Sequence, residues 1–488
     1  MTAHRLIVGA CLAAGFTTLL DQSVLNVAMP ALRGSLHAGD ATLQWIMAGY
    51  SLTFGLALVP AGRLGDMYGR RTLFAGGLTV FALGGVVAAL ASDAWLVAAA
   101  RLVQGAGAGV VNPQIIGLFQ DLFTGTGRAR ALGAYAVVGG VAASVGPPVG
   151  GVILHLAGDD PGWRLVLLLN LPFAIATVPL ALKLLPKDVP DRRGTQLDLP
   201  GLVLLAAATL AVLLPLVGAP GGWWWAAAAA AGVGALVAWE RRYTARGRTA
   251  LLLPALTRSR GFVLGTLVAM CYFGAALALN LVIALFLQDG LGLSPLAAAA
   301  LSLPGAVGFA ASSTASHRLV SRYGRHGVSA ALGVAAVSVA AAAAATALLP
   351  VGGVVVALGV SQLVTGAAGG LINAPNQALT LTHAPPGAGG LSAAMLQLSQ
   401  RLAASVSIAA VTGIFLHTAQ AGLLQSYRAA LTHGTLLCLA LVLLSLLFAV
   451  ADGVPNRAVA GGVPNRAVAD GVSVSAVADG PTIRRSTV

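Results

Sequence analysis

Long apolar segments, separated by short polar connections, run through most of this chain. Segments of roughly 20 apolar residues are long enough to cross the hydrocarbon core of a bilayer as a helix. Fourteen such segments are present, at 6–30, 41–61, 72–92, 95–119, 131–156, 164–185, 200–218, 222–239, 261–287, 295–316, 327–349, 351–379, 391–416 and 430–450. The pattern predicts an all-α integral membrane protein with 14 transmembrane helices, because a chain in lipid must satisfy its backbone hydrogen bonds internally.

The connections between these segments predict the domain organisation. Only residues 218–222 join the seventh and eighth segments, so we expect these two to form a central hairpin between two six-helix bundles. The predicted parts are an N-terminal six-helix bundle at 1–193, two extra transmembrane helices at 194–248, a C-terminal six-helix bundle at 249–451 and a tail at 452–488.

The tail differs in composition from the rest of the chain. It repeats the sequence Gly-Val-Pro-Asn-Arg-Ala-Val-Ala at 453–460 and 462–469 and lacks an apolar run of membrane-spanning length. We expect a disordered cytoplasmic segment, with binding of a partner as the alternative.

Lysine and arginine gather in alternate connections, which predicts the orientation of the chain. Loops that face the cytoplasm are enriched in these residues. If the N-terminus lies inside, the inner loops hold basic clusters at 63–71, 128–130, 183–193, 241–260 and 318–325. An even number of helices then places both termini in the cytoplasm.

Composition narrows the class of protein further. Only 9% of the 488 residues are charged and 57% are hydrophobic, whereas a soluble domain carries about 25% charged residues. The net charge of +13 comes from short clusters in the loops, so we expect a lipid bilayer around the protein and no nucleic-acid partner. The three cysteines lie far apart and the histidines are scattered, which predicts neither a metal site nor another cofactor.

Three ionisable residues, Asp21, Arg101 and Arg401, lie inside predicted membrane helices, where each costs at least ~2.5 kcal/mol. Asp21 and Arg101 lie at similar depth on the first and fourth helices, so they can pair if these helices are neighbours. A carboxylate whose partner changes between two conformations binds a proton with different strength in each, which is the requirement for proton coupling. A static ion pair and a permanently hydrated Asp21 are the alternatives. For Arg401 the alternative is that it reaches the cytoplasmic end of its helix.

A short charged turn separates the second and third predicted helices. Residues 62–72 contain four charges and three glycines between two apolar runs. With charged residues at neighbouring helix ends, we expect a gate that holds the cytoplasmic side shut in one conformation. A purely topological role is the alternative. The candidate gate residues are Gly62, Arg63, Gly65, Asp66, Gly69, Arg70, Arg71, Asp121, Arg128 and Arg130.

The fifth predicted helix carries a motif of glycine and proline at Gly146, Pro147, Gly150 and Gly151. Gly146 and Gly150 lie one turn apart and allow another helix to approach closely. Proline removes an amide donor and favours a kink. A bent, closely packed helix can seal one half of the protein against the other, and a kink without function is the alternative.

Four motifs together resemble the fourteen-helix drug:proton antiporters of the major facilitator superfamily. Residues 62–71 resemble the superfamily's loop between helices two and three, and 20–30 resemble the first-helix motif, whose acid matches Asp21. Residues 101–107 resemble the fourth-helix motif, whose arginine matches Arg101, and 145–151 resemble the fifth-helix antiporter motif. The resemblance covers nearly all of the chain before the tail. It implies that Asp21 is a protonation or cation-sensing site, that Arg101 takes part in proton transfer, and that the protein exports rather than takes up its substrate.

The second half of the chain departs from this family pattern. Residues 316–325 resemble the charged turn at 62–71, but His317 and Ser321 stand where a glycine and an acid are expected. The repeat supports two related halves, although we expect that the second gate cannot use an acid that is absent. Asp21 is the only acid predicted deep in the membrane, which suits anionic or neutral lipophilic substrates at least as well as dicationic ones.

These features predict a proton-coupled multidrug or antibiotic efflux transporter that works by alternating access in a bacterial plasma membrane. A proton-coupled importer of a small metabolite with the same fold is the alternative, and no motif supports an enzyme, a channel or an ATP-driven pump. We expect a monomer whose partners are protons and a lipophilic small molecule. The candidate substrate-contacting residues are Asn26, Gln104, Asn112 and Arg401.

Overall fold

The computed structural model is helical throughout the residues that it describes, which are 2–123, 125–186, 198–219, 222–248, 254–384 and 389–453. No strand occurs in these ranges, so the predicted all-α fold class is confirmed. The helices are α1 (Thr2–Leu36), α2 (Asp40–Tyr68), α3 (Arg70–Leu90), α4 (Ala94–Leu122), α5 (Gly125–Ala157), α6 (Asp159–Leu168), α7 (Leu171–Leu184), α8 (Leu199–Leu216), α9 (Trp223–Ala245), α10 (Pro254–Arg258), α11 (Arg260–Leu285), α12 (Pro295–Ala300), α13 (Leu303–Leu348), α14 (Val351–Leu381), α15 (Gly389–Ala419) and α16 (Leu424–Gly453), with a π-helical turn η1 (Phe286–Gly290).

Thirteen helical segments in the described part of the chain are long and apolar enough to cross a membrane. The predicted count of 14 is therefore not confirmed. The missing candidate is the predicted segment 222–239, which does form a helix, α9. Three tryptophans at its start and the charged residues Glu240, Arg241 and Arg242 near its end lower the hydropathy of α9.

Two glycines in the left-handed region divide long helices at corresponding places in the two halves. Gly69, with φ of 102°, ends α2, and its N–H donates to the carbonyl of Gly65 at 3.0 Å. Gly324, with φ of 51°, interrupts α13. Residues with a Cβ seldom adopt such backbone angles. Both charged turns thus bend at a glycine, which agrees with the repeat predicted from the sequence.

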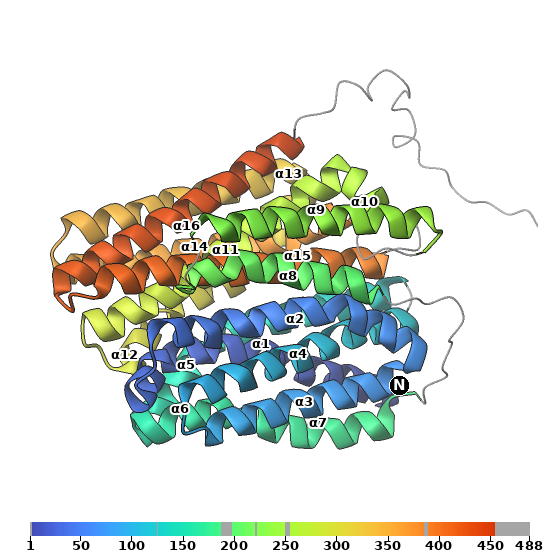
Figure 1. Cartoon of the computed structure of the whole chain (residues 1–488), viewed down its shortest axis with the longest axis horizontal. Helices are drawn as coiled ribbons and strands as arrows, with labels where there is room; N and C mark the ends of the chain where they lie inside the picture. Colours follow the sequence, from blue (N-terminus) through green and yellow to red (C-terminus); the bar gives the residue numbers. More distant parts are fainter. Residues whose placement is uncertain are drawn as a thin grey trace, which may run out of the picture. The chain divides into compact units, whose positions relative to one another are not determined.

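The helices of residues 2–453 form two groups that lie side by side (Figure 1). Helices α1–α7, the N-terminal half, pack on one another through α1 with α5, α2 with α4, and α3 with α4 and α7. Helices α11–α16, the C-terminal half, pack through α13 with α14 and α16, and α11 with α15. Helix α8 contacts α9 and α15. The predicted domain boundaries at 193 and 248 lie at or beyond the edges of the described ranges. The predicted tail at 452–488 begins with two residues that belong to α16, and residues 454–488 lie outside the described part.

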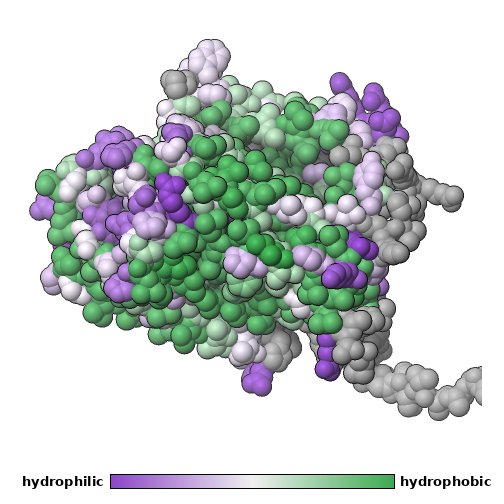
Figure 2. Space-filling model, turned by 90° about the horizontal axis from the view of Figure 1, so that it is seen from below, coloured by the Kyte–Doolittle hydropathy of each residue, from purple (hydrophilic) through white to green (hydrophobic). Residues whose placement is uncertain are grey.

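The two halves meet along a seam, where α1, α2 and α5 contact α11, α12, α13 and α15. The outer surface is apolar across the middle of the face in Figure 2, and polar side chains gather toward both ends of the helices. Large apolar side chains such as Leu90 and Leu156 are 75% and 79% exposed. A surface of this kind is suited to lipid rather than water.

Candidate functional site

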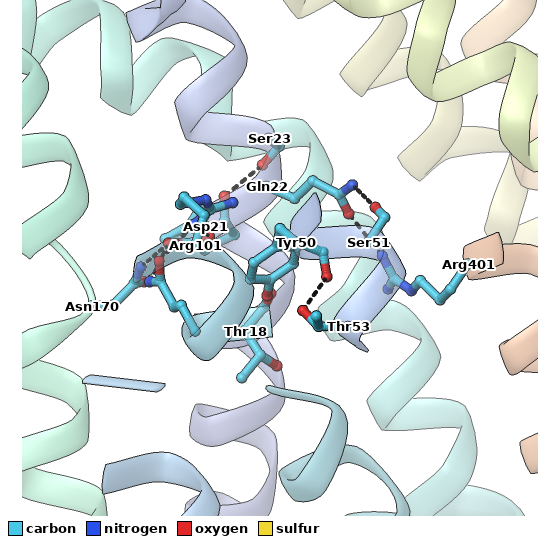
Figure 3. A network of polar contacts seen from close by, with 12 residues as sticks. Thr18, Asp21, Gln22, Ser23, Tyr50, Ser51, Thr53, Arg101, Asn170 and Arg401 are labelled. Carbon is cyan, nitrogen blue, oxygen red and sulfur yellow. Dashed lines mark hydrogen bonds and ion pairs between the residues drawn. The ribbon is translucent and has the colours of Figure 1, made fainter. Parts of the chain in front are cut away.

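Asp21 lies at the centre of a buried polar network inside the N-terminal half (Figure 3). Its Oδ2 forms an ion pair with Nη1 of Arg101. Its Oδ1 accepts hydrogen bonds from Nε2 of Gln104 at 2.9 Å and Nδ2 of Asn170 at 2.7 Å. Asp21 is 4% exposed and Arg101 is 1% exposed. Both carboxylate oxygens therefore accept from donors, as an ionised acid does.

Local sequence places these donors. Helix α4 begins at Asp93, whose carboxylate accepts the backbone N–H groups of Trp95 and Leu96 at 2.9 and 3.1 Å. Arg101 and Gln104 are three residues apart on α4 and so share one helix face, where Arg101 also donates to Oε1 of Gln104 at 2.7 Å. The sequence predicted the possible pairing of Asp21 with Arg101, and the structure places them together. Gln104, a candidate substrate-contacting residue, donates to Asp21 in this structure.

Tyr50 on α2 supports Arg101 from the other side. The guanidinium carbon of Arg101 lies 4.2 Å from the centre of the Tyr50 ring, a cation–π contact. The hydroxyl of Tyr50 donates to the carbonyl of Thr18 at 2.9 Å. Arg101 is thus fixed by an acid, an amide and a ring that come from three helices.

A second network begins at the next residue of α1. Nε2 of Gln22 donates to the hydroxyl of Ser51 at 2.7 Å, and Nη1 of Arg401 donates to Oε1 of Gln22 at 2.7 Å. Arg401, on α15, is 8% exposed. It does not reach the end of its helix, which was the alternative left open by the sequence. Figure 3 shows Asp21 and Gln22 directed to different sides of α1, so Gln22 links the N-terminal half to the C-terminal half.

Further contacts across the seam lie toward the end of the bundle that holds the α1–α2 connection. Gln288 donates to the carbonyl of Val27 at 3.1 Å, and Ser405 donates to the carbonyl of Ala48 at 3.1 Å. An ion pair of 4.0 Å joins Nη1 of Arg33 to Oδ2 of Asp289. These contacts hold that end of the seam closed.

The glycine motif of α5 packs closely on α1 beside both networks. A Cβ at Gly146 would lie 1.9 Å from Oγ of Ser23, and one at Gly150 would lie 3.0 Å from the carbonyl oxygen of Val24. Gly151 faces the C-terminal half, where a Cβ would lie 2.8 Å from Cβ of Ala299. Pro147 lies within the helix between these contacts. The motif therefore contacts α1 on one side and the seam on the other.

We expect Gly146→Ala to weaken the packing of α5 on α1 by about 1–3 kcal/mol, because neither Ser23 nor the adjacent backbone has room for a methyl group. The thermal midpoint of the purified protein should fall. The matched control is Gly139→Ala on the same helix, where a Cβ meets only the flexible end of Leu19 at 3.2 Å. Equal midpoints for the two variants would contradict the close packing at Gly146.

The predicted gate residues surround the ends of α2, α3 and α4. Nε of Arg70 donates to Oδ2 of Asp121 at 2.7 Å, in a half-exposed ion pair. The side chain of Arg70 lies across Gly117, where a Cβ would clash with it. Arg63 is buried within electrostatic range of Asp198 and Glu240, on the segment of α8 and α9.

The remaining gate candidates divide into those with and without a described side chain. Gly62 lies near Pro113, Gly65 lies against Gln114 and Arg71 lies in the first turn of α3. The side chains of Asp66, Arg128 and Arg130 lie outside the described part of the structure.

The corresponding turn in the C-terminal half has no acid of its own, as Ser321 indicated, but its Arg325 pairs with an acid from another helix. Arg325 forms an ion pair with Asp452, at the end of α16, and donates a hydrogen bond to Oδ1 of Asn376 on α14. The side chains of Arg325 and Asp452 are 9% and 10% exposed. The sequence could not indicate this partner, because the acid comes from the last helix rather than from the turn.

We expect Asp452→Asn to destabilise the C-terminal half by about 1–3 kcal/mol, because it leaves the Arg325 charge without its carboxylate. A lower thermal midpoint would show this effect. Truncation after Gly453 is the matched control, since it removes the tail and keeps Asp452. If the truncated protein loses as much stability as Asp452→Asn, the ion pair is not the cause.

The other predicted substrate contacts lie apart from Asp21. Nδ2 of Asn112 donates to the hydroxyl of Tyr135 on α5. Asn26 is buried, and its Oδ1 has no hydrogen-bond partner among the described residues. Sequence reasoning did not assign Gln22 to the site, although an amide beside Asp21 in an apolar helix was a usable signal. No group of histidine, cysteine and acidic side chains in the described ranges could hold a metal ion.

Comparison with known proteins adds to this geometry. The pattern of the Major Facilitator Superfamily matches residues 11–408. A probable actinorhodin transporter of Streptomyces coelicolor is 35% identical over 305 residues, which are 61% of this chain and 53% of the relative. A puromycin resistance protein of Streptomyces alboniger is 33% identical over 314 residues, 62% of this chain and 60% of the relative. The match thus spans little more than half the length of these relatives.

Two solved structures share the fold. A partially occluded, inward-open structure of the xylose transporter XylE from E. coli gives a TM-score of 0.61 at 14% identity, with 92% of this chain and 99% of that chain covered. An auto-inhibited peptide transporter of the POT family gives a TM-score of 0.62 at 16% identity, with coverage of 93% and 96%. At these identities the likeness concerns the fold alone.

Proposed function

Because this chain belongs to the Major Facilitator Superfamily, we propose that it is a drug:proton antiporter that exports lipophilic small molecules by alternating access. The observation that carries this proposal is the position of Asp21. Among the described residues it is the one acid away from the ends of the membrane spans, and it is directly followed by the residue that bonds to the other half. Relatives named as a probable actinorhodin transporter, a puromycin resistance protein and a drug efflux pump support export rather than uptake.

A proton on Asp21 would disrupt the hydrogen bonds that surround it in this structure. All three partners of the carboxylate are donors, from Arg101, Gln104 and Asn170. A protonated acid would direct its own O–H at one of these donors and would lose a hydrogen bond. Proton binding therefore favours a different arrangement of α1 and α4, which makes protonation and conformation interdependent.

Gln22, the residue directly after Asp21, connects α1 to the seam between the two halves. The donors to Asp21 come from the N-terminal half, so rocking of the two halves as rigid bodies would leave them in place. Gln22, in contrast, binds Arg401 of the C-terminal half. A shift of α1 on protonation of Asp21 would move Gln22 and weaken this bond between halves. A proton can thus bias the opening of the seam.

The basic loops indicate the orientation of the protein in the membrane. We place both termini in the cytoplasm of a bacterial cell, because the inner loops then hold the arginine clusters. The closed end of the seam, near the α1–α2 connection, then faces outward. Substrate enters from the cytoplasm or inner leaflet while Asp21 is ionised, and a proton taken up from outside resets the carrier after release. The energy source is the proton gradient.

Proton movement in inverted membrane vesicles tests this function. Vesicles that contain the protein are energised, puromycin, ethidium and fluorescein are added in turn, and internal pH is followed with a quenched dye. We expect at least one compound to release protons from these vesicles and none to do so from vesicles without the protein. Uptake of a compound without any proton release would contradict antiport.

A further inference from the structure

Arg401 introduces a positive charge at the seam that no described acid balances. Among the described residues inside the spans, the charges of Asp21 and Arg101 cancel in their ion pair. Arg401 lies in the interior of the span Ser392–Ala419 and forms no ion pair in the described ranges. A buried charge without a counterion is costly and is rarely retained without a role.

Two aromatic rings lie beside the guanidinium group of Arg401. Its guanidinium carbon lies 4.1 Å from the centre of the Phe54 ring and 5.3 Å from that of the Phe273 ring. Its one hydrogen bond to another side chain in the described part runs from Nη1 to Gln22. A guanidinium carries five N–H donors, so Arg401 has donors left for a ligand.

We propose that Arg401, Gln22, Phe54 and Phe273 form a substrate subsite for planar aromatic compounds that carry an acid group. The free donors of Arg401 would bind the carboxylate, a pairing that guanidinium geometry favours. The partly exposed ring of Phe273 would pack against the aromatic plane, and the buried ring of Phe54 would support the guanidinium of Arg401. This proposal rests on the proposed export function and specifies the chemical class of its substrate.

The position of the subsite between the two halves suits the binding of a transported ligand rather than a purely structural contact. Gln22 and Phe54 belong to the N-terminal half, whereas Phe273 and Arg401 belong to the C-terminal half. A carboxylate on the free donors of Arg401 would lie beside Oε1 of Gln22, the group that joins the halves there, and the two acceptor groups would repel each other. Binding of an acid would thus loosen the same link that protonation of Asp21 affects. A cationic ligand would instead meet the uncompensated charge of Arg401 and be repelled.

Three pyrene compounds that differ in charge test the subsite: 1-pyrenecarboxylic acid, 1-pyrenecarboxamide and 1-pyrenemethylamine. Binding to the purified full-length protein is measured by fluorescence anisotropy at neutral pH. We expect the wild type to bind the acid about tenfold or more tightly than the amide, and the amine most weakly. Arg401→Gln should lower affinity for the acid about tenfold and leave affinity for the amide within about twofold. The affinity of Arg401→Lys for the acid should fall between those of the wild type and Arg401→Gln, because lysine keeps the charge and lacks the planar guanidinium group.

Arg164→Gln is the matched control, because Arg164 also stacks on an aromatic ring, 4.3 Å from Trp163, but lies away from the seam. It should leave the order of the three ligands unchanged. Equal binding of acid and amide by the wild type would overturn the subsite, and this result does not depend on any variant that fails to fold. An equal loss of affinity for the acid and the amide in Arg401→Gln would also overturn the subsite and would indicate that Arg401 has a structural role.

The pyrene-binding test of the subsite and the vesicle test of the proposed function can fail independently of each other. Preference for the acid without proton movement in vesicles would retain the subsite and reject antiport. Proton movement without preference for the acid would retain antiport and reject the subsite.

Discussion

Asp21→Asn is expected to reduce proton release in the vesicle assay to the level of vesicles without the protein. The variant removes the one acid in the interior of a membrane span, so no acid remains there among the described residues to exchange a proton. It should also destabilise the protein by about 1–3 kcal/mol, because the asparagine oxygen can accept from Arg101 while its N–H groups then meet the donors of Gln104 and Asn170. Vesicle assays therefore need a measurement of the amount of folded protein in the membrane.

Two control variants sharpen this test. Asp21→Glu keeps an acid at the site and should retain part of the proton release. Asp289→Asn removes an acid that lies at the end of a span near Arg33, and it should leave proton release close to that of the wild type. Full proton release by folded Asp21→Asn would show that another group carries the proton.

Arg101→Gln is expected to cause the largest loss of stability, about 3–5 kcal/mol, because it leaves the buried carboxylate of Asp21 without its counterion. The double variant Asp21→Asn with Arg101→Gln should recover part of this loss, since neither residue is then charged. It should remain inactive in proton release. Thermal midpoints of the wild type, both single variants and the double variant give the coupling between the two positions. Strictly additive losses would contradict a direct ion pair.

The Asp21 site shows how far sequence reasoning reaches. The depth of Asp21 and Arg101 in their helices could be counted from the sequence, and with it their possible pairing. Asn170 could not be placed, because it lies 149 residues from Asp21 at the junction of α6 and α7, where the chain leaves one helix and begins another. Its position depends on how the helices pack and not on a spacing.

The charged turns and the helix count show two further limits. Gly69 and Gly324 bend the two charged turns, but the acid that pairs with Arg325 comes from α16, and no local pattern could predict it. The predicted hairpin at 194–248 shows the other limit: α8 and α9 form helices that contact each other, yet α9 is not among the thirteen candidate spans in the described part of the chain. Tryptophans at its start and charged residues at 240–242 lower the hydropathy of this helix.

Proton flux through the purified protein in liposomes is the measurement that shows whether Asp21 couples proton movement to transport of the compound. The liposomes contain trapped pyranine, the membrane potential is held at zero with valinomycin and potassium, and the compound with the largest vesicle response is added outside. The account predicts compound-driven proton movement by the wild type and none by Asp21→Asn, which should still exchange labelled for unlabelled compound. Proton movement of equal size in both proteins, or none in a wild type that exchanges the compound, would contradict antiport through Asp21.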